Sequence, residues 1–368
     1  MALYLTRGHP AALALVTRAV ENERPPHAIL LAGPRGVGKT TLALDFAAGL
    51  LCLAAERSAR PCRECAACRK VAHGNHPDLH RLAPEGAGQQ IRVGQVQSLA
   101  SELALLPLEG RYRIAIIESA QRLNIDAQNA LLKTLEEPPP AVVIVLAADD
   151  SAALLPTVVS RCARLRLGPL PVEPIAQIIA AAGLADSARA ATIARLAGGR
   201  PGVALALAAQ PESTLVQARL AGALLDLLGA DRRRRMAAQA ELLEDAALLQ
   251  RAVTGGSEDM EPPRRAERSS GGRRVSPAER RAAAAQLLQV WRDVARDLAV
   301  AARGGVRELR QHDLLDQFAA AGSAVDPAAA ARFVDRLDAV SRALDAYANP
   351  ELAIDTLLLE WPGRRETA

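Results

Sequence analysis

Two hydrophobic periods alternate along the first 168 residues. Short apolar runs are typical of buried β-strands, and stretches with apolar residues three or four positions apart are typical of helices. Strands that alternate with helices predict a parallel, doubly wound α/β sheet through about residue 168. The predicted strands are 27–32, 78–82, 111–117, 142–146 and 163–167, the last an edge strand. The predicted helices are 10–22, 40–51, one that follows a short extended lead-in within 91–106, and one capped by Asp126 that ends at Pro138.

After Gly168-Pro169 the pattern becomes helical throughout. Short helices up to about residue 210 predict a small helical lid domain (169–210), and the long Ala/Leu-rich helices beyond it predict an all-α collar domain (211–368). The segment 254–276 is rich in Gly, Ser, Pro and charge, with few apolar residues to bury. It is therefore predicted to be a disordered loop within the collar rather than a binding arm.

Composition narrows the class of protein. Half of the 368 residues are apolar but only 2% are aromatic, so the core must be built from Ala, Leu, Val and Ile. Neither a membrane-spanning run nor an N-terminal basic-then-apolar signal pattern is found, so a cytoplasmic protein is expected. The net charge of +4 is weak evidence, because residues 251–280, with seven Arg against five Asp or Glu, supply half of it. A basic nucleic-acid face does not follow from these totals.

A complete phosphate-binding loop follows the first predicted strand. Glycines let successive backbone N–H groups point at phosphate oxygens, Lys39 supplies a charge for the outer phosphates, and the Thr40 hydroxyl can hold Mg²⁺. Because the motif lies between a strand and a helix, a chance Gly-rich turn is the weaker alternative. The predicted nucleotide-binding residues are Gly33, Pro34, Arg35, Gly36, Val37, Gly38, Lys39, Thr40 and Thr41.

Four of the five cysteines fall close together, at Cys52, Cys62, Cys65 and Cys68. Two interlocked C-x-x-C steps, completed by Cys52 at the end of the preceding helix, predict a structural Zn²⁺ module at 52–68 with no open position for chemistry. Disulfides are disfavoured in a cytosolic chain, and the ferredoxin continuation of an iron–sulfur site is missing. The nearby histidines at 73, 76 and 80 are interpreted as ordinary loop and strand residues, and Cys162 stands apart.

These motifs together resemble the clamp-loader branch of the AAA+ family. The resemblance rests on His27–Gly33 before the phosphate loop, the four-Cys module, Asn129–Pro138 and Ser160-Arg161-Cys162, with weaker support from residues 349–353. It implies an AAA+ P-loop domain (1–168) that binds ATP or ADP with Mg²⁺, followed by a lid and a collar. In that family five subunits form an open ring that loads a sliding clamp onto primed DNA, so tau/gamma motor subunits and a delta subunit are the implied partners. Arg161 would then be an arginine finger that reaches the nucleotide of the neighbouring subunit.

Three departures from the family pattern bear on hydrolysis. The Asp-Glu pair expected after the third strand is replaced by Glu118-Ser119, and the polar sensor expected after the next strand by alanines at 147 and 148. Gly202 stands where the lid should supply an arginine, with Arg200 nearby but out of helical register. The losses predict a subunit that binds nucleotide and hydrolyses it slowly or not at all. A hydrolysing motor subunit of the same complex and a stand-alone P-loop enzyme such as a nucleotide kinase are the alternatives.

Overall fold

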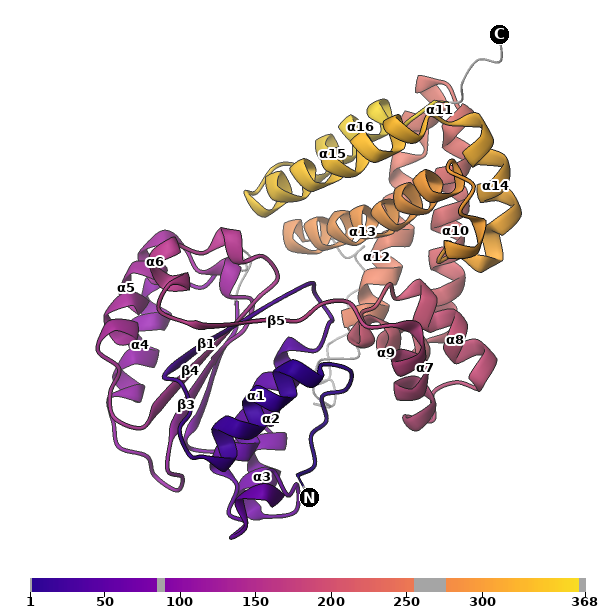
Figure 1. The fold of residues 1–368 in the computed structure, drawn as a ribbon. Coiled ribbons are helices and arrows are strands. Elements are labelled where there is room, and N and C mark those ends of the chain that lie inside the picture. The colour runs from indigo at the N-terminus through magenta and orange to yellow at the C-terminus, as the bar shows by residue number, and fades with distance from the viewer. Residues whose placement is uncertain (1, 85–89, 255–275, 364–368) are drawn as a thin grey trace, which may run out of the picture. The chain divides into compact units, whose positions relative to one another are not determined.

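The computed structural model describes residues 2–84, 90–254 and 276–363. Contacts divide the chain into two compact units (Figure 1). Unit 1 comprises Met1–Pro174 and Gly199–Gly202, and unit 2 comprises Ile175–Gly198 and Val203–Ala368. The predicted boundaries at 168 and 210 remain a prediction.

Unit 1 is built on the parallel sheet that the hydrophobic pattern predicts. Every pairing between its strands is parallel, in the order β2-β3-β4-β1-β5, and the predicted strand at 163–167 does form one edge. In this order the strand that precedes the phosphate loop lies between β4 and the edge strand β5. The strands are β1 (Ala28–Ala32), β2 (Leu79–Leu82), β3 (Arg113–Ile117), β4 (Val142–Ala148) and β5 (Ala163–Arg166).

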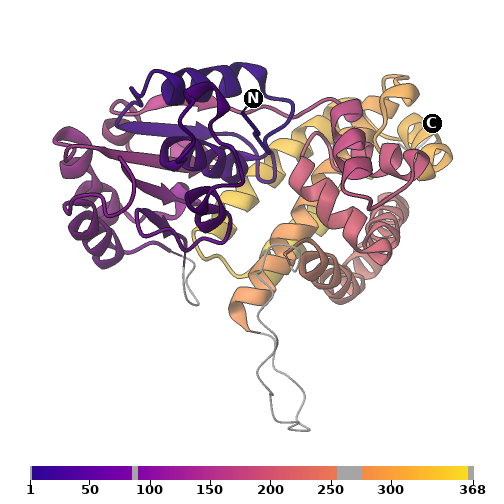
Figure 2. The ribbon, with the colours of Figure 1, turned by 90° about the horizontal axis from the view of Figure 1, so that it is seen from below.

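Helices cover both faces of this sheet (Figures 1 and 2). Successive side chains of a strand point to opposite faces, so Ile29 and Leu31 pack on one layer of helices while Ala28 and Leu30 pack on the other. Both layers are almost wholly aliphatic, as the composition requires. The first layer contains α1 (Pro10–Glu21), α2 (Lys39–Leu51) and α3 (Ala66–Ala72), and the second contains α4 (Val93–Leu103), α5 (Ile125–Glu136) and α6 (Pro156–Val159).

One local prediction in unit 1 is wrong. The helix expected to be capped by Asp126 begins two residues earlier, with Asn124 as its N-cap accepting a hydrogen bond from the backbone N–H of Ala127. Asp126 lies in the first turn, where a carboxylate favours the helix dipole without capping the backbone. Both residues are common helix starters, so the sequence alone did not decide between them.

Unit 2 consists of helices, as predicted after residue 168. Its centre is α13, which packs on α12, α14, α15 and α16. Three of the chain's few aromatic residues meet there, with ring centroids of Trp291 and Phe333 each about 5 Å from that of Trp361 (5.5 and 4.7 Å). The helices are α7 (Val172–Ala181), α8 (Ser187–Leu196), α9 (Pro201–Ala209), α10 (Pro211–Asp226), α11 (Arg232–Ala237), α12 (Gln239–Thr254), α13 (Pro277–Ala301), α14 (Leu315–Ala324), α15 (Pro327–Asp345) and α16 (Pro350–Glu360), and the first residues of α7 and α9 belong to unit 1.

Two further sequence predictions concern the disordered loop and the absence of a membrane-spanning segment. Apart from its end residues Thr254 and Ser276, the predicted disordered loop lies outside the described residues. Among the described helices, none combines the length and apolar character that crossing a membrane requires.

Candidate nucleotide and metal sites

The phosphate loop joins the carboxyl end of β1 to the first turn of α2. Gly38 caps α2 with φ 106°, a backbone conformation that side chains disfavour. A Cβ at Gly33 would lie 2.1 Å from the carbonyl oxygen of Leu167, so only glycine fits between β1 and the end of β5. Along the loop Val37 is buried, while Pro34 and Arg35 are exposed. The backbone of the loop therefore favours glycine at positions 33 and 38.

The ammonium group of Lys39 is fully engaged. Its Nζ donates to the carbonyl oxygens of Gly33 (2.7 Å) and Pro34 (2.9 Å) and to Oδ1 of Asp149 (2.6 Å). Only 8% of the Lys39 side chain is exposed, against 36% for Asp149. Three acceptors use all three N–H bonds of an ammonium group, so a bound phosphate must replace at least one of them.

Asp149 is the site residue that the sequence analysis missed. It follows β4 directly, beyond the buried alanines at 147 and 148, and Gln121 holds it through hydrogen bonds to both its carboxylate (3.0 Å) and its backbone N–H (3.1 Å). The signal was available, because the first polar residue after a buried parallel strand lies at the carboxyl edge of the sheet.

Glu118 and Ser119 follow β3, where the family pattern has an Asp-Glu pair, and neither offers a free carboxylate. Glu118 accepts hydrogen bonds from Nε and Nη2 of Arg81 on β2, at 2.9 and 2.7 Å. Ser119 turns the chain away from the strand with φ 51°. Its hydroxyl is a poor substitute for a carboxylate base at neutral pH. Glu118 is thus paired with a cation of the chain itself.

Glycine at position 202 lets the start of α9 approach the phosphate loop. The backbone N–H of Gly202 donates to the carbonyl oxygen of Gly36 at 2.8 Å, within unit 1. A Cβ at 202 would lie 3.2 Å from that oxygen and 3.3 Å from Cα of Gly36. A larger residue here would press on the loop.

Arg161 lies between α6 and β5, with its guanidinium partly exposed. It forms an ion pair with Glu136 at the end of α5 (2.6 Å) and donates to the carbonyl oxygen of Thr157 (2.9 Å). The Arg161 side chain is 36% exposed and that of Glu136 49%. Exposed ion pairs contribute about 0–1 kcal/mol, so this one can be exchanged for another acceptor at little cost.

The four cysteines meet as the sequence predicts. Their Sγ atoms all lie within 4.8 Å of one another. Cys52 Sγ is 3.5 Å from that of Cys62 and 4.0 Å from that of Cys65, close to the edge of about 3.8 Å that Zn–S bonds of 2.3 Å give in a tetrahedron. The cluster could therefore bind a metal ion such as Zn²⁺.

The surroundings of the sulfur atoms suit thiolate ligands. Backbone N–H groups of Cys65 and Cys68 point at the Sγ atoms of Cys62 and Cys65, both at 3.4 Å. Burial raises the pKa of the Cys62 thiol, but backbone hydrogen bonds from Cys65 and Glu64 outweigh this and bring the pKa to about 7. Burial raises the pKa of Cys68, whose thiol lies near the carbonyl oxygen of Ala48 in α2. A metal ion would compensate the charge of such buried thiolates.

The cysteine cluster is tied to the N-terminal segment and to the helix after the phosphate loop. Asp45 in α2 is fully buried and accepts hydrogen bonds from the backbone N–H groups of Leu5 (3.1 Å) and Thr6 (2.7 Å). Its carboxylate also pairs with Arg63, whose Nε donates to the carbonyl oxygen of Leu3 (2.8 Å). The module thus shares one polar network with α2.

Two of the nearby histidines have other partners. His76 is buried, with Nδ1 accepting from the backbone N–H of Asp78 (3.1 Å), and His80 pairs with Glu102 (2.6 Å). Within the described residues, the only group of three or more His, Cys, Asp or Glu side chains placed to share a metal is the four cysteines.

Comparison with known proteins gives a consistent result for the N-terminal part. Residues 8–171 match the family model described as DNA polymerase III, delta subunit. The chain is 37% identical over 166 residues to DNA polymerase III subunit delta' of Bacillus subtilis, which is 45% of this chain and 49% of that protein. It is 42% identical over 145 residues to subunit delta' of Pseudomonas aeruginosa (39% and 44%). Subunit tau/gamma of Haemophilus influenzae is 35% identical over 173 residues (47% and 25%).

The matched region spans about half the length of the two delta' proteins. It contains the phosphate loop, the four cysteines and Arg161, and it coincides closely with the continuous part of unit 1. Residues 8–171 of this chain therefore match the family described as DNA polymerase III, delta subunit, and are similar to DNA polymerase III delta' subunits.

Proposed function

We propose that this chain is a clamp-loader subunit of DNA polymerase III that binds nucleotide, hydrolyses it slowly or not at all, and supplies Arg161 to a neighbouring ATPase subunit. One observation carries the proposal. An intact phosphate loop with a buried lysine lies beside strand ends that carry Ser119 and two buried alanines in place of a base and a sensor. Its partners would be tau/gamma and delta subunits in a hetero-pentamer that places a sliding clamp on primed DNA.

The loop fits ATP or ADP with Mg²⁺. Once a nucleotide is bound, its phosphates would lie against the loop N–H groups and Lys39, and the Thr40 hydroxyl would be the metal ligand. Hydrolysis needs a carboxylate that activates water, and Glu118 is held by Arg81 while Ser119 cannot take its place. Loss of a general base typically costs about 10²–10⁴-fold in rate.

The test is nucleotide binding and turnover by the purified full chain. We expect saturable binding of a fluorescent ATP analogue that Lys39→Ala weakens at least about tenfold, because one charge-assisted contact is lost. Turnover should stay below about 0.1 per second, at least one order of magnitude under the range of about 1–10³ per second of ordinary enzymes. Lys133→Ala removes an equal charge from an exposed position in α5 and should leave binding unchanged.

The principal alternative is a hydrolysing motor subunit, which the similarity to tau/gamma proteins favours. It requires fast turnover by the isolated chain, so a rate near or above one per second contradicts our proposal and supports this one. A stand-alone P-loop enzyme would also turn over alone, with an acceptor substrate present.

Asp149 should oppose nucleotide binding, because its carboxylate occupies the ammonium group that phosphates need. We expect Asp149→Asn to tighten binding of Mg²⁺-free ATP by about five- to tenfold, the range of a partly exposed charged hydrogen bond. Titration of labelled nucleotide in the presence of EDTA measures the effect.

Asp150→Asn is the matched control for this variant. It makes the same charge change one residue further on, and asparagine can keep the hydrogen bond that Asp150 accepts from Ala152. Equal tightening in both variants would show a general charge effect and remove the specific role of Asp149.

A further inference from the structure

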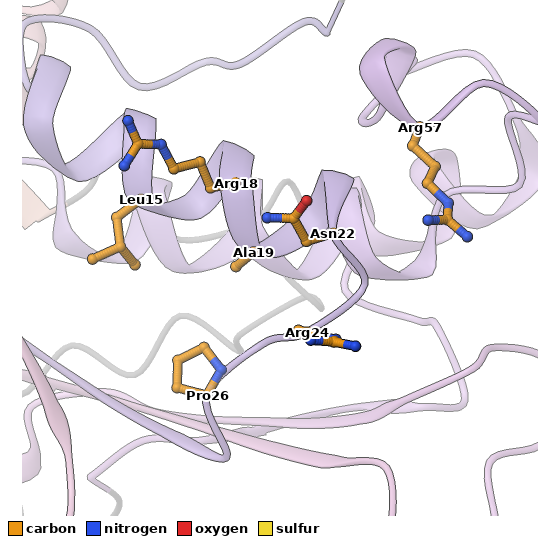
Figure 3. Close-up of a pocket in the computed structure, with 7 residues that line it drawn as sticks. All are labelled: Leu15, Arg18, Ala19, Asn22, Arg24, Pro26 and Arg57. Carbon is orange, nitrogen blue, oxygen red and sulfur yellow. The ribbon is translucent and has the colours of Figure 1, made fainter.

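A basic groove lies in unit 1, beside the C-terminal half of α1. It has a volume of about 650 Å³. Figure 3 shows α1 as one wall, the segment that carries Arg24 and Pro26 along the other side, and Arg57 at one end. The lining residues are Leu15, Arg18, Ala19, Asn22, Arg24, Pro26 and Arg57.

Arginine dominates this groove, and its positive charge is only partly compensated. Arg57 pairs with Glu23 at 2.8 Å, but the same carboxylate also holds Arg60 (3.0 Å) and Arg111 (2.7 Å). One negative charge is thus shared by three guanidinium groups. Burial raises the pKa of Glu23, but these arginines outweigh it and lower the pKa below its usual value. The groove's rim therefore keeps a net positive charge at neutral pH.

Arg18 and Arg24 add two further charges. Both side chains are exposed, and in the described parts of the chain neither forms an ion pair. Arg18 and Asn22 are four residues apart on α1, so they lie on one face, one turn apart. The two arginines and the amide of Asn22 all line the groove and bring hydrogen-bond donors to it (Figure 3).

This groove is separate from the phosphate loop. Pro26 precedes the first residue of β1, whereas the phosphate loop follows its last. A strand of five residues spans about 16 Å, so the groove and the phosphate loop lie at opposite ends of β1. A ligand in the groove does not depend on nucleotide binding.

We propose that this groove binds the phosphate groups of a single-stranded nucleic acid. Guanidinium groups bind phosphate oxygens in pairs of parallel hydrogen bonds, and a row of them on an open surface suits consecutive phosphates of a backbone. An acidic peptide is the poorer fit, because protein hot spots use large buried apolar anchors and the groove offers only Leu15, Ala19 and Pro26. The contact is to the backbone and carries no sequence preference.

The experiment compares the full chain with Arg18→Gln/Arg24→Gln by fluorescence anisotropy of a labelled single-stranded DNA over a series of salt concentrations. Loss of two phosphate contacts should weaken binding about tenfold at low salt and reduce the slope of log K against log salt by about 1.4. These two arginines hold no carboxylate, so the fold should not change, and nucleotide binding by the loop should stay at the wild-type level.

Arg232→Gln/Arg233→Gln is the matched control, since it removes two exposed arginines from α11 in unit 2. Full binding in this control, with loss in Arg18→Gln/Arg24→Gln, supports the groove. Equal loss in both variants, or no loss in the first, overturns it. Polyglutamate that binds more tightly than the DNA and depends on the same two arginines would overturn the ligand class and favour an acidic protein partner.

Discussion

Removal of the metal from the four-cysteine cluster is expected to lower the melting temperature of unit 1 by about 10 °C. A structural metal site that is closed by four thiolates contributes its binding free energy to folding. Here the cluster also holds the end of α2 and, through Arg63 and the buried Asp45, the segment around Leu3. The melting temperature of a domain of this size falls by about 2–4 °C for each kcal/mol of lost stability. A loss of ~4 kcal/mol therefore gives a decrease of the expected size.

The measurement is differential scanning calorimetry of the full chain before and after chelation, with metal content checked by elemental analysis. One zinc ion per chain is expected in the purified protein. Cys65→Ser should reproduce the effect of chelation, whereas Cys162→Ser makes the same chemical change outside the cluster and should keep both the zinc and the melting temperature. Unchanged melting after verified zinc loss would contradict a structural role, and visible absorbance with bound iron would favour the iron–sulfur alternative.

The central strands of unit 1 could be predicted because each is a nearly continuous apolar run, whereas β5 was indicated by its alternation of apolar and basic residues. A strand buried on both faces is apolar at nearly every position, as β4 and residues 114–117 of β3 are, and such runs are easily recognised in a sequence. The order of the strands could not be read in this way. The order depends on which apolar faces meet in three dimensions, and the hydrophobic pattern along the chain does not indicate this.

Some features of the candidate site could be predicted from the sequence, and others could not. The phosphate loop and the cysteines are local motifs, because their ligands come from one short stretch of chain. The pairs Lys39–Asp149 and Glu118–Arg81 join residues 110 and 37 positions apart, and only the register of the parallel strands brings them together. The cap of α5 shows the limit of local reading, since Asn124 and Asp126 are both suitable starters and packing decides between them.

Replacement of Arg161 by alanine is expected to lower ATP turnover at the adjacent subunit by at least about a hundredfold. A guanidinium aimed at the outer phosphates offsets charge that develops during phosphoryl transfer, and such arginines contribute about 10³–10⁵-fold in related chemistry. In the isolated chain Arg161 rests on Glu136 and Thr157, both at the surface. The weak ion pair leaves the guanidinium available to a partner, so the variant should keep the wild-type melting temperature.

The assay needs an assembled complex in which only the subunit facing Arg161 can hydrolyse ATP. In the other motor subunits the phosphate-loop lysine is replaced, so that they do not contribute to the measured turnover. Single-turnover hydrolysis is then compared for wild type, Arg161→Ala, Arg161→Lys and Glu136→Gln. The last variant removes the ion pair and keeps the arginine, so a purely structural role predicts that Glu136→Gln and Arg161→Ala behave alike. A role in trans predicts that Glu136→Gln keeps full turnover, that lysine restores little because it lacks the planar fork, and that alanine loses most of it. Wild-type turnover in Arg161→Ala would remove the proposed finger, because no other change in that complex could hide its loss.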